Sequence, residues 1–451
     1  MLDGVIRLSV NSVRQSYCDA QPHFWRRTIS RNLGALLAGL LIASSSVLPP
    51  SAGAQVQPDD VITPAKADKV KDLVSPGVLQ RVKNGLAMKI VETQVIEWPA
   101  PYKAATEANA SKVSLGADHR TITGYVAGLP FPNIDPNDPD AALKVVWNMQ
   151  FRPVLSDDYD LRFVDCDFGY TKGSGASGES LESIQVGHYA GFNLVGRTEV
   201  QPTPTDPDFQ DTGRYWLFAL YPILAPAELR GSGLIRHRFA DPAKSDNIWA
   251  FTAGDRHVRE VGEEMMNDPG GIGQWSPDHF GGFNAKVQNY DYKFLGHKSM
   301  LASINALNSP ETRCAEDGTV KCAEGWETRQ IDIIEASPRG AGGGAKIDIY
   351  IDTEAWFPPY VDTYSSSGEL FQTSIYWLAN RDRTTADATV AVYPFKRSFV
   401  VAAETQDLKQ GTLTKCYLPG PDTPDREGWY INMGTTPKEF YRTEAMVRAA
   451  Q

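Results

Sequence analysis

The sequence predicts a mainly β protein of the α+β class, in which a few helices precede a meandering antiparallel sheet. Short runs rich in β-branched and aromatic residues follow one another along the chain, and glycine, serine, asparagine or aspartate residues separate them at hairpin distances. Aromatic residues also recur two positions apart within these runs, which places them on one face of a strand. We find no internal repeat of fixed period.

The first 54 residues have the features of an export signal. Arg26 and Arg27 belong to a basic stretch, the run 33–47 is apolar but too short to cross a bilayer, and the small residues of 52–54 suit a signal peptidase. The arginine pair partly resembles a twin-arginine signal, although ordinary secretion is the interpretation that we favour. We therefore expect residues 1–54 to be a signal peptide and the protein to act outside the cytoplasm.

The chain after the signal is expected to be soluble and acidic. We expect a flexible leader over 55–75 and a single large β domain with insertions over 76–451. No apolar run beyond the signal reaches membrane-spanning length, so we expect no stable membrane span. The whole chain carries 44 basic and 55 acidic residues, a formal net charge of −11, and this balance argues against nucleic acid as a partner.

Helical signals are confined to the first part of the expected domain. Apolar residues at helical spacing predict a short helix over 76–84, and a strand is expected to follow over 86–98 until Pro99 ends it. Asp138 followed by proline is typical of a helix start, and apolar spacing continues until Pro153.

Strand signals dominate the rest of the chain. Turn residues separate most of the runs, which favours hairpin connections between neighbours. The predicted strands are 214–221, 228–239, 247–252, 256–261, 289–295, 330–335, 346–352, 361–364 and 370–377.

Paired aromatic residues are the strongest indication of a binding site. Such pairs share one strand face, and that face must be covered by other groups. An ordinary core is one interpretation, and a concave, aromatic-lined groove for an apolar ligand is the other. The candidate cavity residues are Trp216 and Phe218, Trp249 and Phe251, and Tyr290 and Tyr292.

Four cysteines follow the signal, and an even number in an exported chain suggests disulfides. Cys314 and Cys322 bracket an Asp-Gly turn at 317–318 and can pair across it. Cys166 can pair with Cys416 only by elimination, and two buried thiols are an equal alternative.

Motifs for a metal, a cofactor or catalysis are weak. The glycine-rich 173–178 fits the GxGxxG pattern but lacks a surrounding βαβ unit, and it is interpreted as a loop. The acidic stretches 133–140 and 206–211 lack the spacing of a calcium loop and are interpreted as turns. The histidines show no paired metal spacing. We therefore expect no metal and no cofactor.

One alternative function is an envelope hydrolase. Asp278 and His279 are adjacent, and Asp291 is a nearby carboxylate, so acid–base roles are conceivable for the three. Neighbours in sequence seldom converge on one substrate, and no nucleophile elbow is present. A non-enzymatic protein is the interpretation that we favour.

Several segments together resemble a known family. They are 124–132 with the following Val146-Trp147-Asn148, then 256–259, 278–284 running into 290–298, and 350–356. The third is the most specific, because the family has a GFNG-like turn and then YDWKLLGKKE where this chain has GFNA and then YDYKFLGHK. The chain resembles the envelope proteins of domain-of-unknown-function family 1329 over roughly residues 75–445. It departs from the pattern at Ala285, Tyr292 and Phe294.

The resemblance implies a fold similar to the periplasmic carriers that take lipoproteins to the outer membrane. In that fold a curved antiparallel sheet forms an unclosed barrel, helices cover its mouth, and an apolar cavity holds acyl chains. The implied function is a periplasmic carrier or binding protein for a hydrophobic ligand such as a lipid, with an envelope export or outer-membrane partner. A structural subunit of an outer-membrane assembly is a further alternative.

Overall fold

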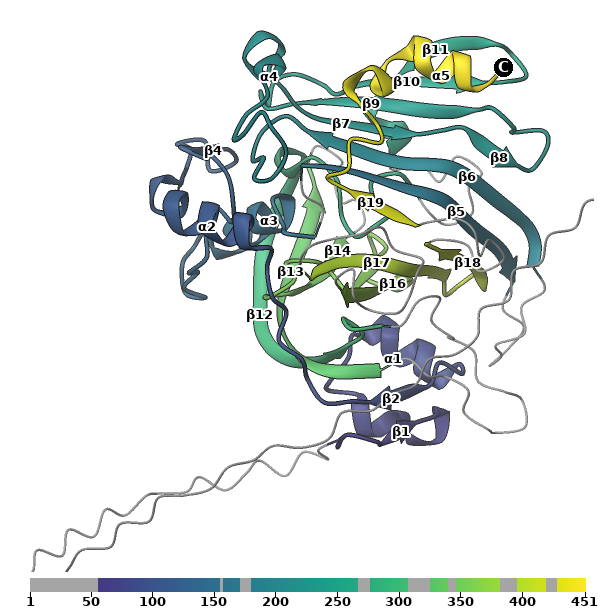
Figure 1. The fold of residues 1–451 in the computed structure, drawn as a ribbon. Coiled ribbons are helices and arrows are strands. Elements are labelled where there is room, and N and C mark those ends of the chain that lie inside the picture. The colour runs from purple at the N-terminus through teal and green to yellow at the C-terminus, as the bar shows by residue number, and fades with distance from the viewer. Residues whose placement is uncertain are drawn as a thin grey trace, which may run out of the picture. The chain divides into compact units, whose positions relative to one another are not determined.

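A large antiparallel sheet dominates the computed structural model (Figure 1). The structure describes residues 56–154, 157–170, 180–266, 276–306, 325–339, 346–381, 396–418 and 428–451. These residues belong to one compact unit, Gly53–Gln451. The predicted signal peptide and the glycine-rich 173–178 lie outside the described residues.

The helices are short and the strands are numerous. The α-helices are α1 (Pro76–Lys83), α2 (Ala100–Asn109), α3 (Ala141–Gln150), α4 (Pro207–Thr212) and α5 (Thr443–Ala449), and the 3-10 turns are η1 (Pro64–Val70), η2 (Ala110–Lys112), η3 (Glu263–Met266), η4 (Val287–Asn289) and η5 (Lys438–Tyr441). The strands are β1 (Val61–Ile62), β2 (Met88–Ile90), β3 (Ser114–Leu115), β4 (Ile122–Thr123), β5 (Asp158–Tyr170), β6 (Ser180–Asn193), β7 (Arg214–Leu220), β8 (Ile223–Ala225), β9 (Gly233–Phe239), β10 (Asn247–Thr252), β11 (His257–Val261), β12 (Tyr290–Ala302), β13 (Gly325–Pro338), β14 (Lys346–Asp352), β15 (Tyr360–Tyr364), β16 (Leu370–Arg381), β17 (Arg397–Asp407), β18 (Thr412–Tyr417) and β19 (Trp429–Ile431).

The main sheet begins and ends on strands that are consecutive in the chain. Its order is β11-β10-β9-β7-β6-β5-β18-β17-β16-β15-β14-β13-β12, with every neighbour antiparallel. Smaller strands attach to it, with β8 on β6, β19 on β5, and β2 parallel to the start of β13. No pairing among the described residues joins β11 to β12. The mainly β class and the unclosed sheet are therefore confirmed.

The sheet curves around a segment of its own chain, residues 276–286. The Tyr189 hydroxyl on β6 donates to the carbonyl of Phe280 at 3.3 Å, and the Tyr376 hydroxyl on β16 donates to the carbonyl of His279 at 2.6 Å. Because β5, β18 and β17 separate β6 from β16, one short segment can contact both only if the sheet is curved. We call the face that carries Tyr189 and Tyr376 the inner face, and the opposite one the outer face.

Helix α1 covers the outer face of β15–β17. The amide of Gly77 donates to Asp362 Oδ2 at 2.8 Å, and Arg81 Nη1 donates to Gln406 Oε1 at 2.9 Å. A Cβ atom on Gly77 would collide with Asp362 and Thr373, so only glycine permits this close approach. Thr373 and Tyr376 lie on opposite faces because strand residues alternate.

The C-terminal turn η5 and helix α5 cover the outer face of β7, β9 and β10. Tyr441 and Met446 pack in one buried cluster with Leu217, Ile235 and Phe251. This cluster is separate from the main hydrophobic core, which combines residues of the strands with α1, α3 and the 276–286 segment. The sheet is thus packed on both faces.

The structure differs from the sequence-based expectation at the N-terminal side. Within the expected flexible leader, β1 pairs with β2, and Ile62 and Val70 are buried in the core. The expected strand 86–98 ends early, because the later amides bond to side chains. Examples are Gln94 N to Glu327 Oε2 at 2.7 Å and Ile96 N to Glu354 Oε2 at 2.9 Å.

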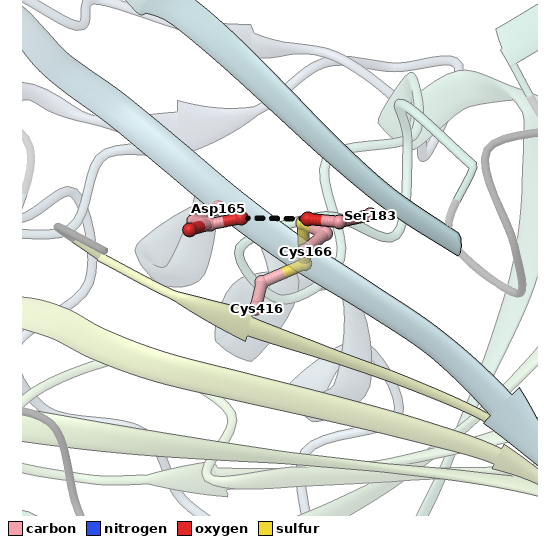
Figure 2. The surroundings of a disulfide bond; sticks show 4 residues. All are labelled: Asp165, Cys166, Ser183 and Cys416. Carbon is pink, nitrogen blue, oxygen red and sulfur yellow. Dashed lines mark hydrogen bonds between the residues drawn. A yellow bond between two sulfur atoms is a disulfide. The ribbon is translucent and has the colours of Figure 1, made fainter. Parts of the chain in front are cut away.

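A disulfide joins Cys166 and Cys416 across the β5–β18 seam (Figure 2). The two residues are direct partners in the antiparallel register, their Cα atoms lie 4.0 Å apart, and both side chains are buried. This pairing decides between the bridge and the two buried thiols that the sequence left open. Cys314 and Cys322 lie outside the described residues.

Candidate functional site

An aromatic-lined cavity of about 210 Å³ lies beside α3 and the β3–β4 hairpin, at the start of β7. We call it the aromatic cavity. Its walls include Ile122, Tyr125, Trp147, Phe151, Phe209 and Tyr215. Aromatic and aliphatic walls of this kind are typical of pockets for small apolar groups.

Ring stacking and hydrogen bonds fix the walls of the aromatic cavity. Trp147 and Phe151 are one helical turn apart, so they lie on the same side of α3 and its C-terminal end, with ring centroids 5.9 Å apart. Tyr125 stacks on Phe151 at 4.0 Å. The Trp147 indole donates to the carbonyl of Arg120 at 3.2 Å, and the Tyr125 hydroxyl to that of Gly128 at 3.0 Å. The polar ends of the rings are therefore satisfied, and their apolar surfaces remain for contact with a ligand.

A second, larger cavity of about 450 Å³ lies between β9 and the start of β12, near the opening of the sheet. We call it the charged cavity. Five buried ionic side chains line it, namely Arg236, Arg238, Asp246, Asp278 and Lys286. Strand alternation places Arg236 and Arg238 on the same face of β9, and the register sets them opposite Phe218 and Trp216.

The two arginines form an ion-pair network with the two aspartates. Arg236 pairs with Asp278, and Arg238 Nε donates to Asp246 Oδ2 at 2.8 Å. Both arginine side chains are 1% exposed. Burial lowers the pKa of Arg236, whereas Asp246 and Asp278 overcome the effect of burial and raise the pKa of Arg238. A guanidinium titrates far above neutral pH, so both groups are cations.

Arg236 keeps unused hydrogen-bond capacity in this network. Its Nε and Nη1 atoms are buried, and neither has a hydrogen-bond partner among the described residues; the same holds for Asp246 Oδ1. The Trp216 ring packs against both guanidinium groups, with centroid distances of 5.5 Å to Arg236 and 5.0 Å to Arg238. The wall of the charged cavity thus includes one cation, Arg236, whose donors are incompletely satisfied.

The aromatic and charged cavities are neighbours. Gln288, in η4, lines both of them. Tyr215 lines the aromatic cavity and also interacts with Arg238 of the charged cavity; burial raises the pKa of its hydroxyl, and Arg238 opposes that rise. The apolar aromatic cavity and the ionic charged cavity therefore lie next to each other.

The structure separates the predicted aromatic pairs into two groups. Trp216 and Phe218 lie on the inner face, where Phe218 contacts Tyr189 with ring centroids 5.0 Å apart. Trp249 and Phe251 lie on the outer face and pack with the cluster beneath α5. A register in which Trp249 pairs with Ile235 fixes this placement.

Tyr290 and Tyr292 lie on β12, at the other side of the opening. Tyr290 lines the charged cavity and packs against Phe283 with ring centroids 5.1 Å apart. Tyr292 packs next to Tyr290, and its buried hydroxyl has no hydrogen-bond partner among the described residues. The structure thus places Tyr290 in the wall of the charged cavity and Trp216 against the two arginines that line it, and it leaves Trp249 and Phe251 on the other face.

The residues of the hydrolase alternative do not form a common site. Asp278 pairs with Arg236, while His279 Nδ1 lies 3.0 Å from Ser276 Oγ. Burial lowers the pKa of His279 to about 4. Asp291 is exposed and pairs with Arg339. Among the described residues, no hydrogen bond joins these three side chains to one another, as a proton relay would require.

Sequence reasoning missed the ionic end of the site. The alternation of apolar and basic residues in 233–239 predicted a strand but not that Arg236 and Arg238 face inward. Two arginines two positions apart on a strand with apolar neighbours were the available signal. Their carboxylate partner Asp278 lies 42 positions away from Arg236, so no local pattern could pair them.

Among the described residues, no helix is long and apolar enough to span a membrane. Within the same residues, no group of three histidine, cysteine, aspartate or glutamate side chains is arranged to hold a metal ion. The acidic stretches are built into turns instead. For example, Asp206 is the N-cap of α4 and accepts from the amide of Asp208 at 3.0 Å.

Comparison with known proteins identifies one family and several distant structures. A family model described as "Protein of unknown function (DUF1329)" matches residues 61–425. A solved domain described as an outer membrane lipoprotein-sorting protein, from Vibrio parahaemolyticus, is 11% identical with a TM-score of 0.44, and the match covers 68% of this chain and 98% of that one. A DUF1329 family protein from Desulfovibrio piger is 10% identical with a TM-score of 0.40, covering 64% and 92%. A LolA superfamily protein from Nitrosomonas europaea is 11% identical with a TM-score of 0.34, covering 64% and 92%. The comparison with curated proteins finds no match.

Proposed function

This chain belongs to the DUF1329 family, and we propose that it is a periplasmic binding or carrier protein for a hydrophobic ligand. The observation that carries the proposal is the aromatic cavity, whose stacked Tyr125, Phe151 and Trp147 rings offer an apolar surface beside the curved sheet. The export signal predicted from residues 1–54 supports the proposed compartment.

The physics of the proposed function requires burial rather than bond chemistry. Moving a methylene group from water into an apolar site contributes about 0.8 kcal/mol. A short alkyl segment in the aromatic cavity would therefore bind measurably without any catalytic group. The engagement of Asp278 with Arg236 and of His279 with Ser276 fits a non-enzymatic role.

The proposal is tested by measuring the binding of decanol, an uncharged straight-chain ligand, to the protein without its predicted signal peptide. Ile122 is half-buried and lines the aromatic cavity. We expect Ile122→Glu to weaken decanol binding by about tenfold or more, because the ligand would have to displace water from a carboxylate. Isothermal titration calorimetry measures the affinity.

Leu115 provides the matched control for Ile122. It is the cross-strand partner of Ile122 in the β3–β4 hairpin, it is half-buried, and the aromatic cavity is lined by other residues. Leu115→Glu is expected to bind decanol as the unmodified protein does. If both variants bind equally, or if the unmodified protein does not bind decanol, the aromatic cavity is not a ligand site.

A further inference from the structure

We infer that the ligand is an anionic amphiphile, with its apolar part in the aromatic cavity and a carboxylate or phosphate group in the charged cavity against Arg236. This inference rests on the proposed function and adds the chemical class of the ligand. Three structural features support it, namely the charge of the buried groups, the unused donors of Arg236, and the contact between the two cavities.

The buried groups of the charged cavity carry an excess of positive charge. Arg236, Arg238 and Lys286 provide three cations, and Asp246 and Asp278 provide two carboxylates. The Lys286 ammonium lies 4.0 Å from Asp246 Oδ1. All five side chains lie in a low-dielectric environment, where an uncompensated charge is costly and an incoming anion is favoured.

Glu263, Glu264 and Arg339 also line the charged cavity nearer to solvent, so the excess of positive charge belongs to the buried part of the cavity. Glu263 accepts hydrogen bonds from the amide of Asp246 at 2.5 Å and from Asn289 Nδ2 at 3.1 Å. Glu264 is exposed, so water and salt screen its charge. Arg339 also lines the cavity and is paired outside it with Asp291.

Arg236 offers donors for an incoming anion. Its Nη2 atom is used by Asp278, whereas Nε and Nη1 have no hydrogen-bond partner among the described residues. A buried donor without an acceptor costs about 1–3 kcal/mol, and a hydrogen bond to a charged acceptor is stronger than one between neutral groups. A carboxylate or phosphate oxygen is the acceptor that best satisfies such a donor.

Because the two cavities are adjacent, one ligand could place an anionic group in the charged cavity and an apolar segment in the aromatic cavity. Gln288 lines both cavities, and Tyr215 reaches from the aromatic cavity to Arg238. A molecule that fills both cavities presents an apolar segment at one end and an anionic group at the other. A purely apolar ligand would leave the Arg236 donors unsatisfied.

Four probes on the exported chain test this inference by titration calorimetry. They are decanoate, decyl phosphate, decanol and inorganic phosphate. We expect decanoate and decyl phosphate to bind about tenfold or more tightly than decanol, because a charge-assisted hydrogen bond adds to the same apolar contacts. Inorganic phosphate is expected to bind more weakly than decyl phosphate.

The outcomes separate this inference from the proposed function. Equal binding of decanoate and decanol overturns the anionic class but leaves the hydrophobic-ligand function standing. Inorganic phosphate binding as tightly as decyl phosphate shows a site for free anions and overturns the amphiphile. If none of the three alkyl compounds binds, the proposed function fails and this inference fails with it.

A charge-balanced variant tests the role of Arg236. Arg236→Gln alone leaves Asp278 buried and less compensated, so the double variant Arg236→Gln/Asp278→Asn removes both charges together. We expect the preference for decanoate over decanol to fall to about twofold or less. Arg259→Gln, in an exposed ion pair with Asp255, is the control and should keep the full preference. If the folded double variant still prefers decanoate over decanol, the assignment of the anion to Arg236 is overturned. If the double variant does not fold, the comparison of decanoate with decanol in the unmodified protein still decides the ligand class.

Discussion

The outer and inner faces of β7, β9 and β10 use the same strand alternation for different purposes. On the outer face, Leu217, Ile235 and Phe251 are sealed by Tyr441 and Met446 from the C-terminal elements. On the inner face, Arg236 and Arg238 line the charged cavity, and the Trp216 ring packs against both guanidinium groups. The aromatic pairs Trp216–Phe218 and Trp249–Phe251 look identical in sequence. Only the covering group distinguishes a structural core from a candidate site.

The chemistry of the covering groups also differs between the two faces. The outer cluster is built of apolar and aromatic side chains. The inner face buries Arg236 and Arg238 against Asp246 and Asp278. Buried ion pairs are weak contributors to net stability compared with apolar packing of the same volume. Replacing the whole inner network by apolar side chains is therefore expected to cost little stability, whereas removing one member of it is expected to cost much.

The largest expected effect comes from opening the outer face. Phe251→Ala removes a large side chain that is 5% exposed, and we expect the free energy of unfolding to fall by about 3–5 kcal/mol. Urea denaturation measures this loss. Decanol affinity of the folded protein should be unchanged, because Phe251 lies on the face opposite the cavities. If the folded Phe251→Ala variant did not bind decanol, the outer face could not be a purely structural core.

Breaking the inner ion-pair network is expected to cost a similar amount. Arg238→Met leaves Asp246 without its 2.8 Å partner in a buried site, and we expect a loss of about 3–5 kcal/mol in the free energy of unfolding. Urea denaturation again gives the value. A loss below about 1 kcal/mol, the range of exposed pairs, would mean that water reaches Asp246 readily.

The inner-face segment 276–286 should give the protein an acid-sensitive stability. Burial lowers the pKa of His279 to about 4, whereas an unfolded histidine titrates near ~6.5. The unfolded chain therefore binds a proton that the folded chain does not, and stability falls as the pH drops from about 6.5 to about 4. His279→Leu should remove up to about 3 kcal/mol of this dependence.

Urea denaturation of the His279→Leu variant and the unmodified protein at several pH values checks this prediction. His237, whose pKa burial also lowers to about 4, and Asp362, whose pKa burial raises to about 6, are present in both proteins. Their effects therefore cancel in the difference. Parallel pH profiles for the two proteins would show that His279 is solvated in the native state.

The disulfide on the inner face should stabilise the seam between β5 and β18. Cys166 and Cys416 are 250 residues apart, so the bridge restricts a long loop in the unfolded chain and is expected to contribute about 2–4 kcal/mol. The double variant Cys166→Ala/Cys416→Ala leaves Cys314 and Cys322 in place. Thermal unfolding of the variant, compared with the unmodified oxidised protein, measures the contribution. An unchanged midpoint would show that strand pairing alone holds the seam.

The smallest effect is expected at an exposed ion pair. Arg259 Nη2 and Asp255 Oδ2 lie 2.8 Å apart, as do Arg238 and Asp246, but the Arg259 side chain is 67% exposed. Arg259→Met should change the free energy of unfolding by only ~0–1 kcal/mol, because water screens the pair. Because the two ion pairs have the same length, a larger loss of stability in Arg238→Met than in Arg259→Met would show that burial makes the difference. Equal losses of unfolding free energy in the two variants would contradict this explanation.

Local sequence patterns predicted many of the elements but missed several central ones. The strand 346–352 was expected where β14 lies, and the 76–84 helix where α1 lies. Central strands β5 and β6 were missed because aspartate, glycine and serine interrupt them, and these residues have low strand propensity. Pairing with neighbours on both sides establishes these strands in spite of their composition.

The sequence by itself determined the mainly β class, the family and the alternation of side chains along each strand, because these depend on neighbouring residues. Only the tertiary structure decided which face is covered by α5, which cysteine pairs with Cys166, and that Arg236 meets Asp278 beside the aromatic cavity. The physical reason is that these features depend on contacts between segments far apart in the chain. A local period can specify two faces of a strand, but long-range packing selects which of them becomes the site.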